Sequence, residues 1–114
     1  MPLNLSLSTR EIGKNLVIEM SGGLTVAQQT LLREYVLRFL EAGKRHFVLK
    51  MEAMSQLDSS GLGQLVTVYT SVTNRGGSVR LLAPSPRVCE LLQITKLDTV
   101  FEIIEDEARI RDIQ

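Results

Sequence analysis

Hydrophobic residues in this chain are spaced first at every second position and then at every third or fourth, and the spacing keeps changing along the sequence. Three leucines over residues 3–7 alternate with polar residues, and a second alternating run follows over residues 16–20. A period of two is typical of half-buried strands, and two such runs joined by a turn around Gly13 predict an antiparallel hairpin. The Ser-Gly-Gly sequence at residues 21–23 is expected to end the second strand.

The spacing then becomes helical. Thr25 is a suitable N-cap residue, Gln28 can complete a capping box with it, and Gly43 suits the position just after a helix. Between these signals the apolar residues Leu32, Val36, Phe39 and Leu40 fall on one helical face. We therefore expect the first helix to start near Thr25.

The rest of the chain alternates in the same way. Residues 46–50 predict a short strand, and the consecutive apolar residues Phe47-Val48-Leu49 indicate that both of its faces are covered. A second helix is expected over residues 62–72, a strand over 79–83, a helix that starts at Ser85-Pro86, a strand over 99–104 and a last helix over 105–113.

Strands that alternate with helices predict right-handed crossovers and a largely parallel sheet. We expect an α/β fold: a small mixed sheet of about five strands with an antiparallel N-terminal hairpin, and about four helices that cover mainly one face. The 114 residues contain no repeat and no long linker, so residues 1–114 are expected to form a single domain.

Composition excludes several classes of partner. The formal net charge is zero, with 13 basic and 13 acidic residues, and aromatic residues make up only 4% of the chain, so we expect no nucleic-acid partner. No apolar stretch approaches the roughly 20 residues of a membrane helix, so we expect no direct membrane insertion. Cys89 is the only cysteine and residues 1–4 do not resemble a signal peptide, so we expect a cytoplasmic protein.

A compact polar stretch, Leu57-Asp58-Ser59-Ser60-Gly61-Leu62-Gly63, lies where the second helix should begin. Either Asp58 or Ser59 could cap that helix, because both side chains carry an oxygen that accepts a hydrogen bond from a first-turn N–H. Two glycines in a first turn are unusual, since each costs about 1 kcal/mol relative to alanine. A cap alone is the simpler interpretation for an arbitrary protein, but a cap and a functional site can coexist here.

An enzyme is poorly supported by the residues. A serine nucleophile needs a base, and His46 is the only histidine. A lysine or an acid could serve in principle, but no spacing indicates one. The sequence also lacks a GxxxxGK[ST] loop and a His/Cys cluster, so we expect no catalytic residue, no cofactor and no metal.

The stretch at residues 58–62, the strand and connector at 47–54, the Asn-Arg-Gly-Gly turn at 74–77 and the helix at 84–92 together resemble the anti-sigma factor antagonists, the STAS-domain proteins of bacterial partner switching. The resemblance covers essentially the whole chain. It implies that the unphosphorylated protein binds a cognate anti-sigma factor, which is also a serine protein kinase, and so releases the sigma factor. Phosphorylation of Ser59, with Ser60 as the alternative, would end this binding, and a PP2C-type serine phosphatase would restore it.

The resemblance also implies a partner-binding surface, and we expect a monomer or weak homodimer. Glycines in this surface would let the backbone of the partner approach closely. Two positions depart from the common family pattern: Thr25 lies where many members have an acid, and Lys50 lies where many have Asp or Asn. The expected partner-binding residues are Gly23, Thr25, Asp58, Ser59, Ser60, Gly61, Leu62 and Gly63.

A second role is open to the same fold. Some STAS domains are subunits of lipid-transport ABC systems, and others belong to signalling scaffolds. Such a protein would use the same surface without phosphorylation.

Overall fold

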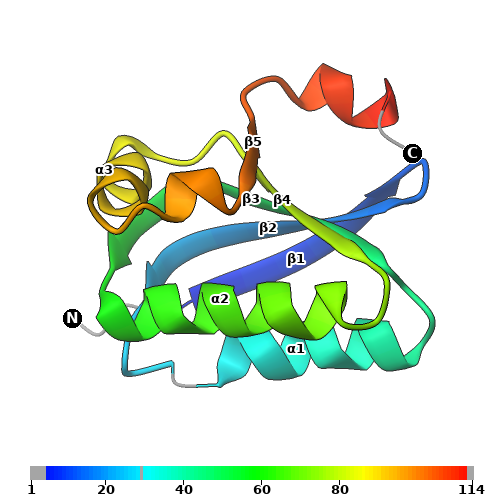
Figure 1. Cartoon of the computed structure of the whole chain (residues 1–114), viewed down its shortest axis with the longest axis horizontal. Coiled ribbons are helices and arrows are strands. Elements are labelled where there is room, and N and C mark those ends of the chain that lie inside the picture. Colours follow the sequence, from blue (N-terminus) through cyan, green and yellow to red (C-terminus); the bar gives the residue numbers. More distant parts are fainter. Residues whose placement is uncertain (1–4, 29, 113–114) are drawn as a thin grey trace.

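The computed structural model describes residues 5–28 and 30–112 and shows one mixed sheet with two long helices on one face (Figure 1). The strands are β1 (Leu5–Ile12), β2 (Asn15–Leu24), β3 (His46–Leu57), β4 (Ser78–Leu82) and β5 (Glu102–Ile104). The helices are α1 (Leu31–Glu41), α2 (Ser59–Thr73) and α3 (Pro86–Ile94), and two 3₁₀ helices follow, η1 (Leu97–Thr99) and η2 (Glu107–Asp112).

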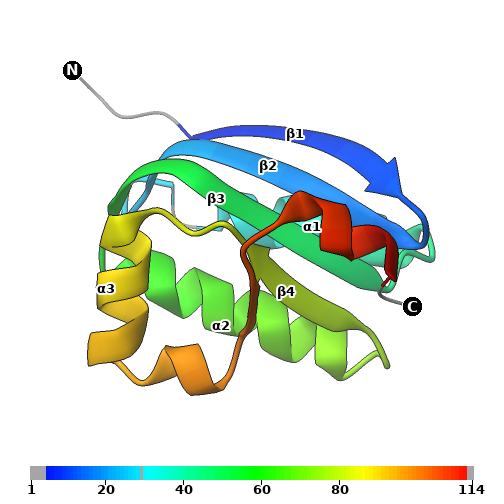
Figure 2. The ribbon, with the colours of Figure 1, turned by 90° about the horizontal axis from the view of Figure 1, so that it is seen from above.

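The five strands lie in the order β1-β2-β3-β4-β5. β1 and β2 pair in antiparallel fashion, and the other neighbouring strands pair in parallel, so the predicted mixed sheet is confirmed. α1 and α2 lie side by side beneath the sheet, whereas α3 lies beside the end of β3 (Figures 1 and 2). The expected count of about four helices is replaced by three α-helices and two 3₁₀ helices in the described residues.

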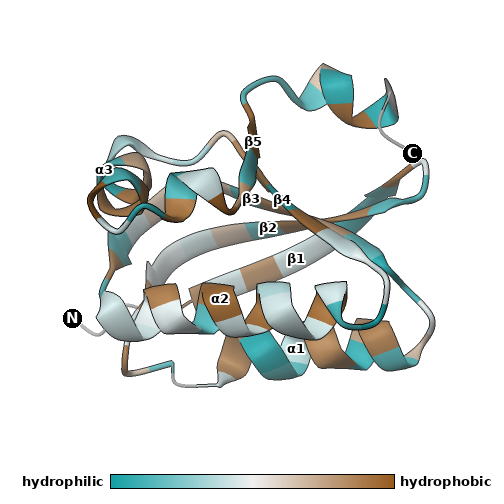
Figure 3. Ribbon diagram, viewed as in Figure 1, coloured by the Kyte–Doolittle hydropathy of each residue, from teal (hydrophilic) through white to brown (hydrophobic). Residues whose placement is uncertain are grey.

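Two apolar cores cover the two faces of β3. The larger lies between the sheet and the helices and includes Phe47 and Leu49, and the smaller includes Val48 together with Ile110 of η2. Consecutive residues of a strand point to opposite faces, so the apolar run at residues 47–49 is buried on both sides as predicted. Figure 3 shows that η2 is mostly hydrophilic, so this segment covers its face of the sheet with few apolar residues.

The first helix begins later than the sequence predicts. α1 starts at Leu31, and Thr30 is its N-cap residue without a side-chain capping bond. Half of the expected capping box exists, and it closes a separate turn: Thr25 N donates to Gln28 Oε1 (2.8 Å), but Gln28 N donates to the Thr25 carbonyl (3.0 Å), where a capping box would use the Thr25 hydroxyl. This turn is held at the start of α2, because Val26 N donates to the carboxylate of Asp58.

β2 and β3 are longer than expected. The Ser-Gly-Gly sequence at 21–23 does not end β2, and β3 continues from residue 50 to Leu57 beside it. The parallel pairing passes through two register shifts, and these bulges disturb the alternation of side chains. Met51, Met54 and Leu57 are buried at every third position, a spacing that a search for period two does not recognise as a strand.

The last part of the chain is less regular than expected. The strand predicted over 99–104 is confined to 102–104, because η1 extends to Thr99 and the amides of residues 100 and 101 donate back to the Leu97 carbonyl. The predicted helix over 105–113 is a 3₁₀ helix over 107–112, and residue 113 lies outside the described residues. Ile110 is the one buried side chain in η2 among residues 107–111, which is too little apolar surface to stabilise an amphipathic α-helix.

No helix within residues 5–28 and 30–112 is both long enough and apolar enough to cross a membrane.

Candidate functional site

Asp58 organises the start of α2. It is the N-cap residue, and its Oδ1 accepts a hydrogen bond from Gly61 N (2.8 Å). Its other oxygen, Oδ2, accepts from Val26 N (3.1 Å) in the turn after β2. Of the two capping candidates, Asp58 and not Ser59 therefore forms the cap, and one carboxylate also holds the neighbouring loop against α2.

The two serines that follow differ in accessibility. Ser59 is the first residue of α2 and is exposed, whereas Ser60 is half-buried. Because Asp58 supplies the cap, the Ser59 hydroxyl is not required for it. An enzyme acting on this turn would reach Ser59 more easily than Ser60.

The two glycines of the first turn have different surroundings. A Cβ built on Gly61 would lie 2.0 Å from the carbonyl oxygen of Leu24 and 2.7 Å from Leu57 Cδ1. Gly61 is therefore needed for the close approach of α2 to the end of β2, inside the protein. A Cβ on Gly63 would meet no atom within 4 Å, so Gly63 is the glycine that faces open space.

The expected partner-binding residues thus gather at one end of the sheet but do not all reach the surface. Ser59 and Gly63 are exposed, Thr25, Asp58 and Ser60 are half-buried, and Gly23, Gly61 and Leu62 are buried. The buried members shape the turn from within. The exposed members, together with the highly exposed Val26 (61%), form the surface that a partner could contact.

An open hollow of about 550 Å³ lies beside this turn. It is lined by Thr25, Ser55, Gln56, Leu57, Asp58 and Arg87. The sequence did not indicate that Arg87 belongs to this site. Arg87 lies on α3, almost thirty positions after Asp58 in the chain. The only local sign was the Ser85-Pro86 helix start before it, which gives no indication of where that helix lies.

Ser85 fixes α3 beside the site. Among the strands, β4 pairs with the first half of β3, up to Lys50, and the second half pairs with β2 alone in the described residues. Ser85 lies at the other edge of this second half: Ser85 N donates to the Met51 carbonyl (3.2 Å) and Ser85 Oγ donates to the Met54 carbonyl (2.9 Å). The same Oγ accepts from Val88 N (3.4 Å) and so caps α3. Ser85 is buried, and its contacts bring the first turn of α3 next to the last residues of β3.

Lys50 lies away from this site. Its Nζ is 3.6 Å from Glu19 Oε1 and 3.5 Å from Glu107 Oε1, across the face of the sheet that η2 covers. Arg10 forms an ion pair with the same Glu107 and donates a hydrogen bond to its carboxylate. The hydrogen bond from Arg10 holds the pKa of the Glu107 carboxyl below its usual range. The lysine at this position therefore belongs to the contact between the sheet and η2.

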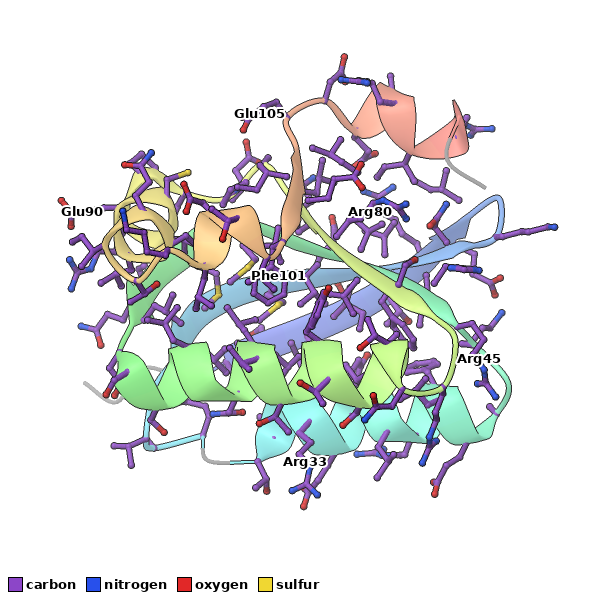
Figure 4. All side chains as sticks on the ribbon, in the orientation of Figure 1. Arg33, Arg45, Arg80, Glu90, Phe101 and Glu105 are labelled. Carbon is purple, nitrogen blue, oxygen red and sulfur yellow. The ribbon has the colours of Figure 1, made fainter. Side chains whose placement is uncertain are left out.

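His46 is also remote from the two serines. It is the first residue of β3, whereas Asp58 follows the last, and its Nδ1 lies 2.8 Å from Ser78 Oγ. Within residues 5–28 and 30–112, no three His, Cys, Asp or Glu side chains are placed to hold a metal ion. Figure 4 shows Glu90 on the outer side of α3 and Phe101 between α2 and the sheet.

The chain resembles known proteins in sequence and in fold. A family model described as the STAS domain matches residues 6–110. A Bacillus subtilis (strain 168) protein named anti-sigma-B factor antagonist is 27% identical over 101 residues, which are 89% of this chain and 92% of that protein.

Two solved structures share the fold. The Bacillus cell fate determinant SpoIIAA in its phosphorylated form superposes with a TM-score of 0.73 at 21% identity, over 96% of this chain and 100% of that one. An anti-sigma factor antagonist from Mycobacterium paratuberculosis gives a TM-score of 0.80 at 18% identity, over 92% of this chain and 89% of that one.

Proposed function

Because this chain belongs to the STAS domain family, we propose that it is an anti-sigma factor antagonist that is switched by phosphorylation of Ser59. The unphosphorylated form binds a cognate anti-sigma factor, a serine protein kinase, and so releases the sigma factor. The observation that carries the proposal is the exposed Ser59 at the first position of α2, beside a cap that does not need it. The name of the Bacillus subtilis relative, which matches over most of its length, supports the same role.

The chemistry of the site suits such a switch. A phosphate on Ser59 would add about −1.5 to −2 charges at neutral pH. The side chain points away from the core, so the added group requires no repacking of Leu62 or the residues beneath it. The charge would instead lie on the surface formed by Val26, Ser59 and Gly63, where it would repel an acidic partner surface and would be costly to desolvate against an apolar one.

The phosphorylated form of SpoIIAA is a solved protein of this fold that carries a phosphate. We extend this to Ser59 here as a proposal, with a PP2C-type serine phosphatase removing the group. The protein would act in the cytoplasm as a monomer or weak homodimer, without a catalytic residue of its own.

The test is phosphorylation in vitro. The full chain is incubated with candidate anti-sigma kinases and ATP, and the product is mapped by mass spectrometry, with Ser59→Ala and Ser60→Ala as a matched pair. We expect one phosphate, lost in Ser59→Ala and kept in Ser60→Ala. A phosphate that persists in Ser59→Ala would contradict the assignment of the residue.

A binding measurement completes the test. Ser59→Asp should bind the kinase at least tenfold more weakly than the wild type, while the unfolding free energy of the two proteins agrees within about 0.5 kcal/mol, as expected for a surface change. Tight binding that is unaffected by Ser59→Asp would instead favour a subunit of a lipid-transport ABC system or a signalling scaffold that works without phosphorylation.

A further inference from the structure

We propose that Arg87 binds the phosphate of phosphorylated Ser59 within the same chain and leaves Glu90 to do so. The inference rests on the proposed function, because it concerns the phosphorylated state of that site. It assigns a role to a residue of α3 that neither the sequence pattern nor the partner-binding surface includes.

The position of Arg87 is fixed by the fold. Arg87 follows Ser85 by two residues, and Ser85 is hydrogen-bonded to two carbonyls at the free edge of β3. The first turn of α3 is therefore anchored next to the strand that leads into Asp58. Arg87 and Asp58 line the same open hollow, and Ser59 is the exposed residue that follows Asp58.

The charges around this hollow leave a phosphate in need of a cation. Among the residues that line the hollow, Asp58 is the only acid and Arg87 the only cation. A phosphate on Ser59 would lie next to the Asp58 carboxylate, whose oxygens already accept from Gly61 N and Val26 N. Two neighbouring anions repel each other, so a phosphate that turns from Asp58 toward Arg87 exchanges a repulsive contact for an attractive one.

The ion pair that Arg87 now forms with Glu90 is weak enough to be replaced by one with a phosphate. Arg87 Nη1 lies 3.0 Å from Glu90 Oε1, and the two side chains are 54% and 61% exposed. Exposed pairs of this kind contribute little, because water screens them and two long side chains must be held still. A phosphate accepts two parallel N–H bonds from a guanidinium and carries more charge than a carboxylate, so it competes well with Glu90.

Figure 4 shows Glu90 on the outer side of α3, away from α2. Movement of the guanidinium from Glu90 to the hollow is therefore a change of rotamer on the surface, and it leaves the helix and its Ser85 anchor in place. Phosphorylation would thus change the surface of α3 as well as that of α2. A partner that contacts α3 would find the charge of Arg87 neutralised by the phosphate.

The experiment installs phosphoserine directly at position 59 of the full chain by genetic code expansion, so that no kinase is needed. The pKa of the phosphate is measured by ³¹P NMR titration in four proteins: the wild type, Arg87→Gln, Glu90→Gln and Arg33→Gln. Arg33 is an exposed arginine on α1 and serves as the matched control. Circular dichroism confirms that each protein is folded.

We expect the phosphate pKa in Arg87→Gln to exceed the wild-type value by at least about 0.3 unit, a twofold change in proton affinity, because a nearby cation favours the dianion. Arg33→Gln should match the wild type, and Glu90→Gln should leave the pKa equal or lower. Identical titrations of wild type and Arg87→Gln would overturn the proposal. Since phosphoserine is incorporated during translation and no kinase is used, that result is distinct from a failure of the kinase reaction.

Discussion

The carbonyl oxygen of Leu24 lies against Gly61 so closely that a side-chain carbon at position 61 would be 2.0 Å from it. The end of β2 and the first turn of α2 are therefore in backbone contact. This contact joins two elements that both contribute to the candidate site, and it holds Asp58 within reach of the loop at Val26.

The first prediction compares the two glycines of α2. Gly61→Ala should lower the free energy of unfolding by about 2 kcal/mol or more, because the backbone of Leu24 has to move to admit a methyl group. Gly63→Ala should raise it by up to about 1 kcal/mol, because alanine is the better helix former and meets no neighbour. Urea denaturation measures both, and a stabilised Gly61→Ala would show that the two elements are not held in this contact.

The second prediction concerns the cap. Asp58→Ala should cost about 1–2 kcal/mol, since it removes the acceptor for Gly61 N and for Val26 N. Asp58→Asn keeps an oxygen and should recover part of the loss. Hydrogen exchange adds a local measure: the Gly61 and Val26 amides should exchange faster in Asp58→Ala. Unchanged protection at Val26 would mean that the loop is held by other contacts.

The third prediction concerns the anchor of α3. Ser85→Ala leaves the buried Met54 carbonyl and Val88 N without their hydroxyl partner, so we expect a loss of about 1–3 kcal/mol. Ser55→Ala is the control, because Ser55 Oγ donates to the Gly22 carbonyl (3.1 Å) at an exposed position. Thermal denaturation should separate the two variants clearly. Equal effects would argue against Ser85 as the anchor.

The fourth prediction concerns pH. The hydrogen bond from Arg10 holds the pKa of Glu107 below its ordinary value of 4.5. A lowered pKa in the folded state contributes stability that is present above pH 4.5 and is lost as the pH falls through the folded-state pKa. The difference in unfolding free energy between wild type and Glu107→Gln should therefore be present at pH 7 and disappear in stronger acid.

The expected effect of Glu107→Gln is small, because the side chains involved are more than a third exposed and water screens their charges. It should shrink further in 1 M salt, where the screening length is about 3 Å. Glu41→Gln, on the exposed surface of α1, is the control. A difference that grows toward acid would contradict the assigned sign of the pKa shift.

Much of this fold could be predicted because local spacing and tertiary burial agree. The hairpin, the run at residues 47–49 and the presence of three α-helices follow from the hydrophobic period, and the helix-start residues locate the starts of α2 and α3 but not that of α1. The extension of β3 to Leu57 could not be predicted in this way, because bulges place the buried residues Met51 and Met54 three positions apart. The 3₁₀ segment η2 has a single buried anchor in Ile110 among residues 107–111, which leaves no period to recognise.

In the candidate site, too, the features with a local sequence signal could be predicted and those that depend on tertiary contacts could not. The stretch around Asp58 and Ser59 is local, and its residue types alone indicate a helix start. Arg87 lines the hollow because Ser85 is hydrogen-bonded to the edge of β3. Ser85 and Met54, which form one of these bonds, are 31 positions apart in the sequence. The need for glycine at position 61 likewise depends on a contact with the backbone of Leu24, which is far away in the sequence.

The contact between η2 and the sheet has a consequence for the order of folding. Arg10 and Glu107 are 97 positions apart, and Asn15 Nδ2 donates to the Ile110 carbonyl across 95 positions (3.4 Å). A chain under synthesis can pair β1 with β2 and β3 long before residue 110 has left the ribosome. Val17 and Val48 lack the cover of Ile110 until then, so on the nascent chain this face of the sheet is the last to be completed, and we expect a chaperone to meet it.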